Sequence, residues 1–139
     1  MRTAIDTNVL SALWGDEPTA RRVSQILFEA GEVGGLVIHP IIYVEARAHP
    51  HTSEEAIHRF LEQTRIVVDW TTGQEVWLLA AERFDAYVRR RRRQGNAEAK
   101  RFPADFLVAS HALLHADRLV TLDQRRYRTD FPELILVEP

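Results

Sequence analysis

The sequence contains no cysteine, which excludes disulfides and thiolate metal sites and fits a reducing compartment. It also has no apolar run near the roughly 18 residues that a membrane-spanning helix needs. Because a strand is expected to begin at residue 2 or 3, we expect no signal peptide in front of it. Together these absences predict a cytoplasmic protein.

Lysine is nearly absent as well, since Lys100 is the one lysine among 18 basic residues. Between Arg83 and Arg101 lie eight basic and only two acidic residues, although the whole chain has a net charge of −2. The planar guanidinium of arginine suits phosphate groups. A genome rich in G and C would also favour arginine codons, so the bias alone does not identify a partner.

The 139 residues, 45% hydrophobic and 27% charged, fit one globular domain spanning 1–139. Strand-like and helix-like patterns alternate along it, which predicts an α/β fold with three α/β/α layers around a five-stranded, mostly parallel sheet. The expected strands are 3–5, 35–40, 65–70, 118–123 and 133–139.

The expected helices have recognisable start and stop signals. Asp16 and Pro18 are typical of a helix start, and Gly31 of its end. A short helix begins at Ile41, and a long apolar one begins at Pro103. The pairs Thr52 with Glu55 and Thr72 with Glu75 predict capping boxes for two more helices, and 94–100 reads as a polar loop.

Four carboxylates follow the ends of predicted strands or begin the next helix. Asp6 directly follows the first strand in "TAIDTNVL", Glu45 follows the second strand, Asp105 lies in the first turn after Pro103, and Asp123 follows "RLVTL". Each alone could be a helix cap or a surface residue. Because the carboxyl ends of parallel strands share one edge of a sheet, we expect all four to converge there.

Such convergence is costly without a cation. Two carboxylates about 5 Å apart repel by roughly 3 kcal/mol at an effective dielectric constant of about 20. Hard oxygen ligands favour Mg²⁺ or Mn²⁺. These ions activate water and stabilise charge on phosphate oxygens, so the cluster predicts hydrolysis of a phosphodiester.

The motifs "IDTNVL", Glu45 in "IIYVEA", Asp105 in "PADFLVASHA" and Asp123 in "LVTLDQRRY" resemble those of PIN-domain ribonucleases of the VapC type, the toxins of bacterial toxin–antitoxin pairs. The resemblance covers nearly the whole chain. It implies a PIN-like fold, an acidic metal site with Mg²⁺, an RNA substrate, a small antitoxin partner and a homodimer. It also implies that Asn8 and Thr121 orient the carboxylates.

Arginines near the predicted site are candidates for RNA binding. Arg125 and Arg126 follow Asp123 closely, and Arg91 lies in the run Arg89–Arg93, which the resemblance does not explain. That run could equally solvate the end of a helix, where positive charge is favourable.

Some polar residues point to other chemistry. His111 and His115 have the i, i+4 spacing of metal ligands, but we find no third ligand at a suitable spacing, so contacts in the core or with a partner are the favoured interpretation. Asp69 ends the third strand, where the receiver domain of a phosphorelay carries its phosphoacceptor. That alternative needs an acidic pair after the first strand and a lysine after the fifth, and the chain has neither. A third possibility is an inactive PIN-like module that only binds RNA or protein; the four carboxylates argue against it.

Overall fold

A five-stranded sheet forms the centre of the computed structural model, which describes residues 1–95 and 100–139. All four strand pairs among the described residues are parallel, and the strand order is β3-β2-β1-β4-β5. The strands are β1 (Thr3–Ile5), β2 (Leu36–Ile38), β3 (Ile66–Val68), β4 (Arg118–Val120) and β5 (Leu136–Val137). The predicted α/β class and five strands are confirmed, and the sheet is wholly parallel.

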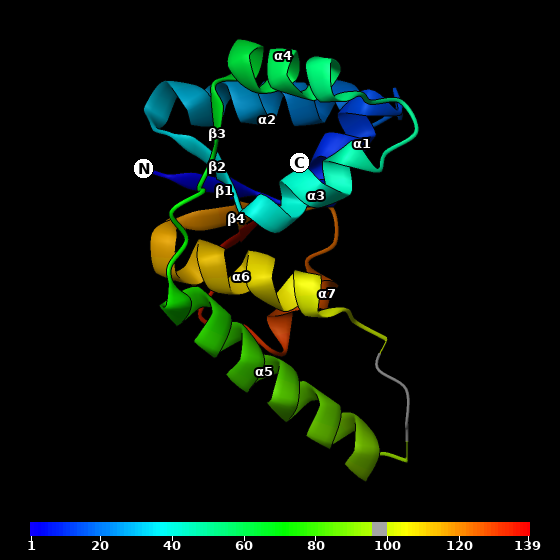
Figure 1. Ribbon diagram of the computed structural model, residues 1–139, viewed down its shortest axis with the longest axis vertical. Helices are drawn as coiled ribbons and strands as arrows, with labels where there is room; N and C mark the ends of the chain where they lie inside the picture. Colours follow the sequence, from blue (N-terminus) through cyan, green and yellow to red (C-terminus); the bar gives the residue numbers. More distant parts are fainter. Residues whose placement is uncertain (96–99) are drawn as a thin grey trace.

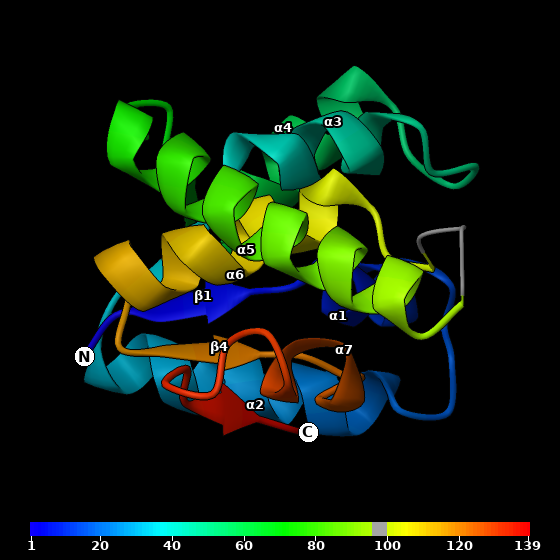
Figure 2. The same ribbon diagram turned by 90° about the horizontal axis from the view of Figure 1, so that it is seen from below.

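Helices cover both faces of this sheet. They are α1 (Thr7–Trp14), α2 (Ala20–Val33), α3 (Pro40–Arg47), α4 (Glu54–Thr64), α5 (Gln74–Arg93), α6 (Pro103–His115) and α7 (Arg125–Arg128). Figure 1 shows α2 and α4 on one side of the sheet and α6 on the other, with α5 outside α6. The view in Figure 2 confirms that α5 lies across α6 and forms the outermost layer there.

The core lies where α6 meets the sheet. All residues from Phe106 to Ala112 are buried, because the sheet covers one side of this helix and α5 the other. Ile5 of β1 and Leu119 of β4 are fully buried in the same cluster. The nearly all-round apolar character of "PADFLVASHALLHA" therefore marks a helix buried between two layers.

The predicted helix signals were partly wrong. The predicted stop at Gly31 lies inside α2, which runs to Val33 and ends at Gly34. Glycine is needed at position 34 because a Cβ there would overlap the backbone of Met1. The first helix, α1, begins directly after Asp6 and precedes the predicted start at Asp16.

Neither predicted capping box forms. The hydroxyl of Thr52 donates to the carbonyls of Ala46 and His49, so Ser53 caps α4 instead. The hydroxyl of Thr72 donates to the Asp69 carbonyl, and Gly73 precedes α5. In both cases the threonine is engaged by the preceding turn before the helix begins.

Two further predictions concern the loop over 94–100 and helices that could span a membrane. The polar loop predicted over 94–100 falls mostly on residues 96–99, which lie outside it. Within the described residues, no helix has the length and apolar character to cross a membrane.

Candidate active site

Asp6 lies at the carboxyl end of β1, where it ends the strand and caps α1. Its Oδ1 accepts a hydrogen bond from the Thr7 amide at 2.7 Å. Its Oδ2 accepts from the hydroxyls of Thr121 at 2.9 Å and Tyr127 at 2.7 Å. The residue is only 2% exposed. Burial raises the pKa of the Asp6 carboxyl above its usual value, although these hydrogen bonds act in the opposite direction.

Thr121 connects Asp6 to Asn8 and Asp123, two residues that the sequence placed at the same site. While donating to Asp6, its hydroxyl accepts from the Asn8 side-chain amide at 3.3 Å and the Asp123 backbone amide at 3.1 Å. The Asn8 carbonyl oxygen in turn accepts from the Leu122 amide at 3.1 Å. Asn8 therefore acts on Asp6 through Thr121, and it connects α1 to the segment that follows β4.

Glu45 reaches the same region from α3. Its Oε1 accepts a hydrogen bond from the Thr7 hydroxyl at 3.0 Å. Because the Thr7 amide donates to Asp6, Thr7 contacts both carboxylates. Partial loss of hydration raises the pKa of the Glu45 carboxyl. The negative charges of Asp6 and Asp105 raise it further.

Asp105 and Asp123 meet at one arginine. Arg126 Nη1 lies 3.4 Å from Asp105 Oδ1, and Arg126 Nε lies 3.6 Å from Asp123 Oδ2. Burial alone would lower the pKa of Arg126, but surrounding negative charge, that of Asp105 foremost, raises it. Arg126, predicted to bind RNA, therefore lies among the carboxylates and partly neutralises them.

The donor set suits a hard divalent cation. The negative charges of Asp6 and Asp105 both act on Glu45, and each of the three residues offers carboxylate oxygens of the kind that Mg²⁺ and Mn²⁺ prefer. The raised pKa values of Asp6 and Glu45 mean that the fold disfavours their ionised forms. A nearby cation would stabilise these ionised forms. Among the described residues, however, no three acidic, histidine or cysteine side chains are already arranged as ligands of one ion. Metal binding would thus require some of these side chains to turn.

Two residues of this network escaped the sequence analysis. Tyr127, in α7, is only 1% exposed and donates directly to Asp6. Burial and the charge of Asp6 raise the pKa of its phenol well above the usual value, so it remains a donor. The other residue, Thr7, is visible in "DTN", but its contact with Glu45 depends on how α1 meets α3.

The other arginines predicted to bind RNA lie on α7 and near the end of α5. Arg125 is exposed, and its backbone carbonyl accepts from Arg101 Nη2. Arg91 is half-buried near the end of α5, the helix that projects from the body at the bottom of Figure 1. In the same run, Arg89 pairs with Asp85 and Arg90 with Asp130. Part of the arginine run therefore makes ion pairs within the fold.

A second polar cluster lies between α6 and the segment that leads from the end of β3 into α5. His111 Nε2 is 2.9 Å from Asp69 Oδ2, and His115 Nε2 is 2.8 Å from Glu75 Oε1. The two histidines thus pair with different carboxylates of the β3–α5 region, which matches the favoured non-metal interpretation. The Asp69 carboxylate accepts from both His111 and Thr71. The strand order also differs from the 2-1-3-4-5 order of receiver domains, which argues against that alternative.

Comparisons with known proteins agree with this fold. The VapBC2 complex from Rickettsia felis, bound to a DNA fragment from its promoter, matches with a TM-score of 0.67 and 19% identity over 99% of this chain and 98% of that chain. VapBC-1 from nontypeable Haemophilus influenzae matches with a TM-score of 0.66 and 22% identity over 99% and 98%. No curated protein matches the sequence. The family model of the PIN domain matches residues 3–132, nearly the whole chain. This chain belongs to the PIN domain family.

Proposed function

We propose that the protein is a metal-dependent endoribonuclease and the toxin of a toxin–antitoxin pair. The observation that carries the proposal is the buried Asp6 carboxylate at the sheet edge, joined through Thr7 to Glu45. Burying an ionisable carboxyl group destabilises a fold, and perturbed groups of this kind gather at functional sites. Membership of the PIN family and the likeness to VapBC structures support the assignment.

Asp6, Glu45, Asp105 and Asp123 would hold Mg²⁺, or Mn²⁺ in its place. When bound, the ion would supply Lewis acidity to water and to the phosphate oxygens of the scissile bond. Thr7 and Tyr127 would hold the Asp6 carboxylate in one orientation, since they donate to its two different oxygens. Arg125, Arg126 and Arg91 would contact RNA phosphates. We expect the protein to act in the cytoplasm.

Cleavage of RNA by the purified protein tests this proposal. We expect cleavage with Mg²⁺, none with EDTA, and a loss of at least 100-fold in Asp6→Asn and Asp105→Asn. Asp85→Asn is a suitable control, because Asp85 is an exposed acid paired with Arg89 on α5. If the two site variants cleave RNA as fast as the wild type, the acidic site is not the catalytic one.

The same assay separates the alternatives. RNA that binds to the wild type but is not cut under any metal condition would indicate an inactive PIN-like module. Labelling of Asp69 by a small phosphodonor, without cleavage, would indicate a receiver function.

We also propose that a small antitoxin binds this protein, as VapB binds VapC in the complexes that share the fold. A groove of about 810 Å³ between α1, α2 and α4 offers an apolar seat, lined in part by Trp14, Leu27, Phe28 and Phe60. Phe28 is 69% exposed there. A cognate antitoxin should inhibit cleavage by the wild type, and Phe28→Glu should weaken that inhibition while leaving basal cleavage intact.

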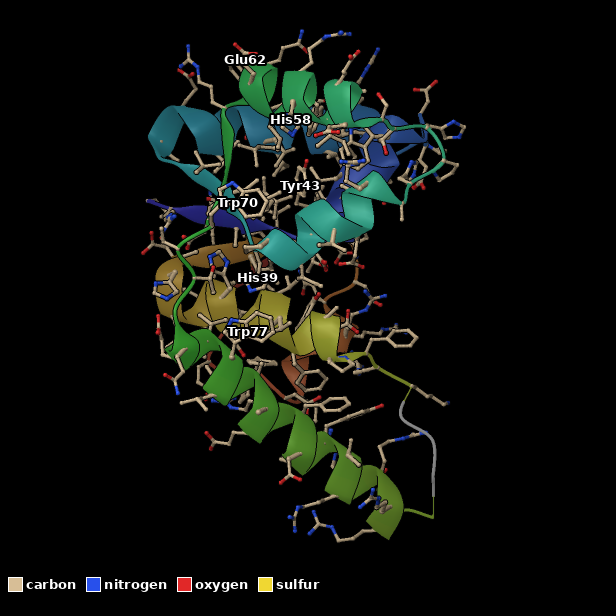
Figure 3. The ribbon with its side chains drawn as sticks, viewed as in Figure 1. His39, Tyr43, His58, Glu62, Trp70 and Trp77 are labelled. Atoms are coloured by element: carbon tan, nitrogen blue, oxygen red, sulfur yellow. The ribbon has the colours of Figure 1, made fainter. Side chains whose placement is uncertain are left out.

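A homodimer is the remaining part of the proposal. Trp70 and Trp77 are 64% and 54% exposed, which is unusual for tryptophan. Trp70 packs edge-on against Tyr43, and Trp77 against His39, so the aromatic rings follow one face of the molecule (Figure 3). Light scattering should report a dimer, and replacing both tryptophans by serine should shift it towards the monomer.

A further inference from the structure

Arg126 is a cation placed among the acidic residues of the candidate active site. It contacts Asp105 with one nitrogen and Asp123 with another. Its charge also acts on Asp6 and Glu45. Its side chain is 36% exposed, so the guanidinium contacts Asp105 and Asp123 while staying partly open to solvent.

The contacts of Arg126 differ from those of a structural ion pair. Arg83 binds both carboxylate oxygens of Glu133, at 3.0 Å and 2.7 Å, and Arg90 contacts Asp130 at 2.9 Å. Arg126 instead makes one longer contact with each of two carboxylates, at 3.4 Å and 3.6 Å. It therefore spans the space between Asp105 and Asp123 rather than fixing either one.

The charge of the site indicates what this does. With Asp6, Glu45, Asp105 and Asp123 ionised, the site carries four negative charges, of which Arg126 offsets one. One divalent ion would leave a single negative charge, whereas two ions together with Arg126 would leave an excess of positive charge. A second divalent ion between Asp105 and Asp123 would also have to share their oxygens with the guanidinium.

We propose that Arg126 takes the place of a second metal ion, so that the site binds one divalent cation on the side of Asp6, Glu45 and Asp105. This inference rests on the proposed function only in that a divalent cation binds at all. Because Arg126 stays partly open to solvent, the same guanidinium can meet a phosphate oxygen of the substrate. It would thereby supply, without a metal, the positive charge that a second ion provides in two-metal nucleases.

The number of bound Mn²⁺ ions tests the proposal without measuring activity. Titration of metal-free protein with Mn²⁺, followed by the EPR signal of the free ion, should give one ion per chain for the wild type. Arg126→Gln should bind two ions, and their spectrum should show the spin coupling expected of ions about 4 Å apart. Arg126→Met provides a second neutral variant of similar length should the glutamine variant fail to fold.

Matched controls isolate the position and the charge. Arg125→Gln removes an exposed neighbouring arginine and should still bind one ion. Arg126→Lys keeps the charge and should also bind one ion. Asp6→Asn should weaken binding of that ion at least 10-fold.

Each outcome is informative. Two ions in the wild type, or one ion in both neutral Arg126 variants, would overturn the role of Arg126 and leave the nuclease proposal intact. No ion in the wild type or in any variant would overturn the metal site itself, and with it both proposals.

Discussion

The hydrogen bond from Tyr127 to Asp6 allows a test that removes a single oxygen atom. In Tyr127→Phe the ring still fills its buried position, but Asp6 Oδ2 loses the donor at 2.7 Å and keeps Thr121 at 2.9 Å. A hydrogen bond to a charged group contributes about 1.5–3 kcal/mol to stability, and one between neutral groups about 0.5–1.5 kcal/mol. The cost of the substitution should therefore depend on whether Asp6 is ionised.

The sign of this dependence follows from the pKa of Asp6. Burial raises that pKa in the folded protein, so the folded state holds the proton to a higher pH than the unfolded chain, whose carboxyl ionises near 3.8. The contribution of Asp6 to stability is therefore greatest below that value and falls as the pH rises through the raised pKa. Tyr127 opposes this loss because its hydrogen bond lowers the pKa of Asp6. Without it, the loss at higher pH should be larger.

Urea unfolding of the metal-free protein at about pH 3.5, below the unfolded value of 3.8, and at about pH 8 measures the effect. We expect Tyr127→Phe to lower the free energy of unfolding by about 1 kcal/mol at the lower pH and by about 2–3 kcal/mol at the higher pH. Tyr87→Phe is the control, because the buried Tyr87 hydroxyl accepts from the backbone amides of Lys100 and Arg101. Its cost should not change with pH. An equal, pH-independent cost for both variants would refute the role of Tyr127 at Asp6.

Two further predictions concern the rest of the fold. Burial lowers the pKa of His39 to about 4, so its ring should stay neutral at pH 5.5 in NMR titrations. The fold should lose on the order of 3 kcal/mol as the pH falls from about 7 through 4, because the unfolded chain takes up the proton first. An ordinary titration of His39 near pH 6.5 would contradict this. Arg90→Gln should lower the free energy of unfolding by about 1–3 kcal/mol, because it leaves the buried Asp130 without its 2.9 Å partner. Arg92 is exposed, and Arg92→Gln should change that free energy by less than about 0.5 kcal/mol. Equal effects of the two substitutions in urea unfolding would refute the distinction within the arginine run.

The features that the sequence predicted well are those that depend on local patterns. The first strand and the acidic residue that ends it are visible in "TAIDTNVL", because an apolar run gives way to a capping residue within one turn. The buried helix α6 is visible because its apolar residues cover more than one face. Parallel topology then places the ends of β1, β2 and β4 at one edge of the sheet.

The remaining features depend on contacts between distant parts of the chain. Tyr127 lies 121 residues from Asp6, and no local pattern marks it as the partner of that carboxylate. Arg126 was predicted to bind RNA from its nearness to Asp123, but its contact with Asp105 depends on how α7 packs beside α6. The caps at Ser53 and Gly73 were missed because the neighbouring threonines bond backward to the preceding turns.

The chemistry of the cleaved RNA tests the central claim most directly. The wild type should be incubated with one defined RNA and Mg²⁺ in water enriched in ¹⁸O, and the products analysed by mass spectrometry. If water attacks the phosphodiester at the acidic site, the new terminal phosphate carries one ¹⁸O atom, and this product is lost in Asp6→Asn and Asp105→Asn. A 2′,3′-cyclic phosphate without ¹⁸O, or the same product at the same rate from both variants, would contradict hydrolysis at this site.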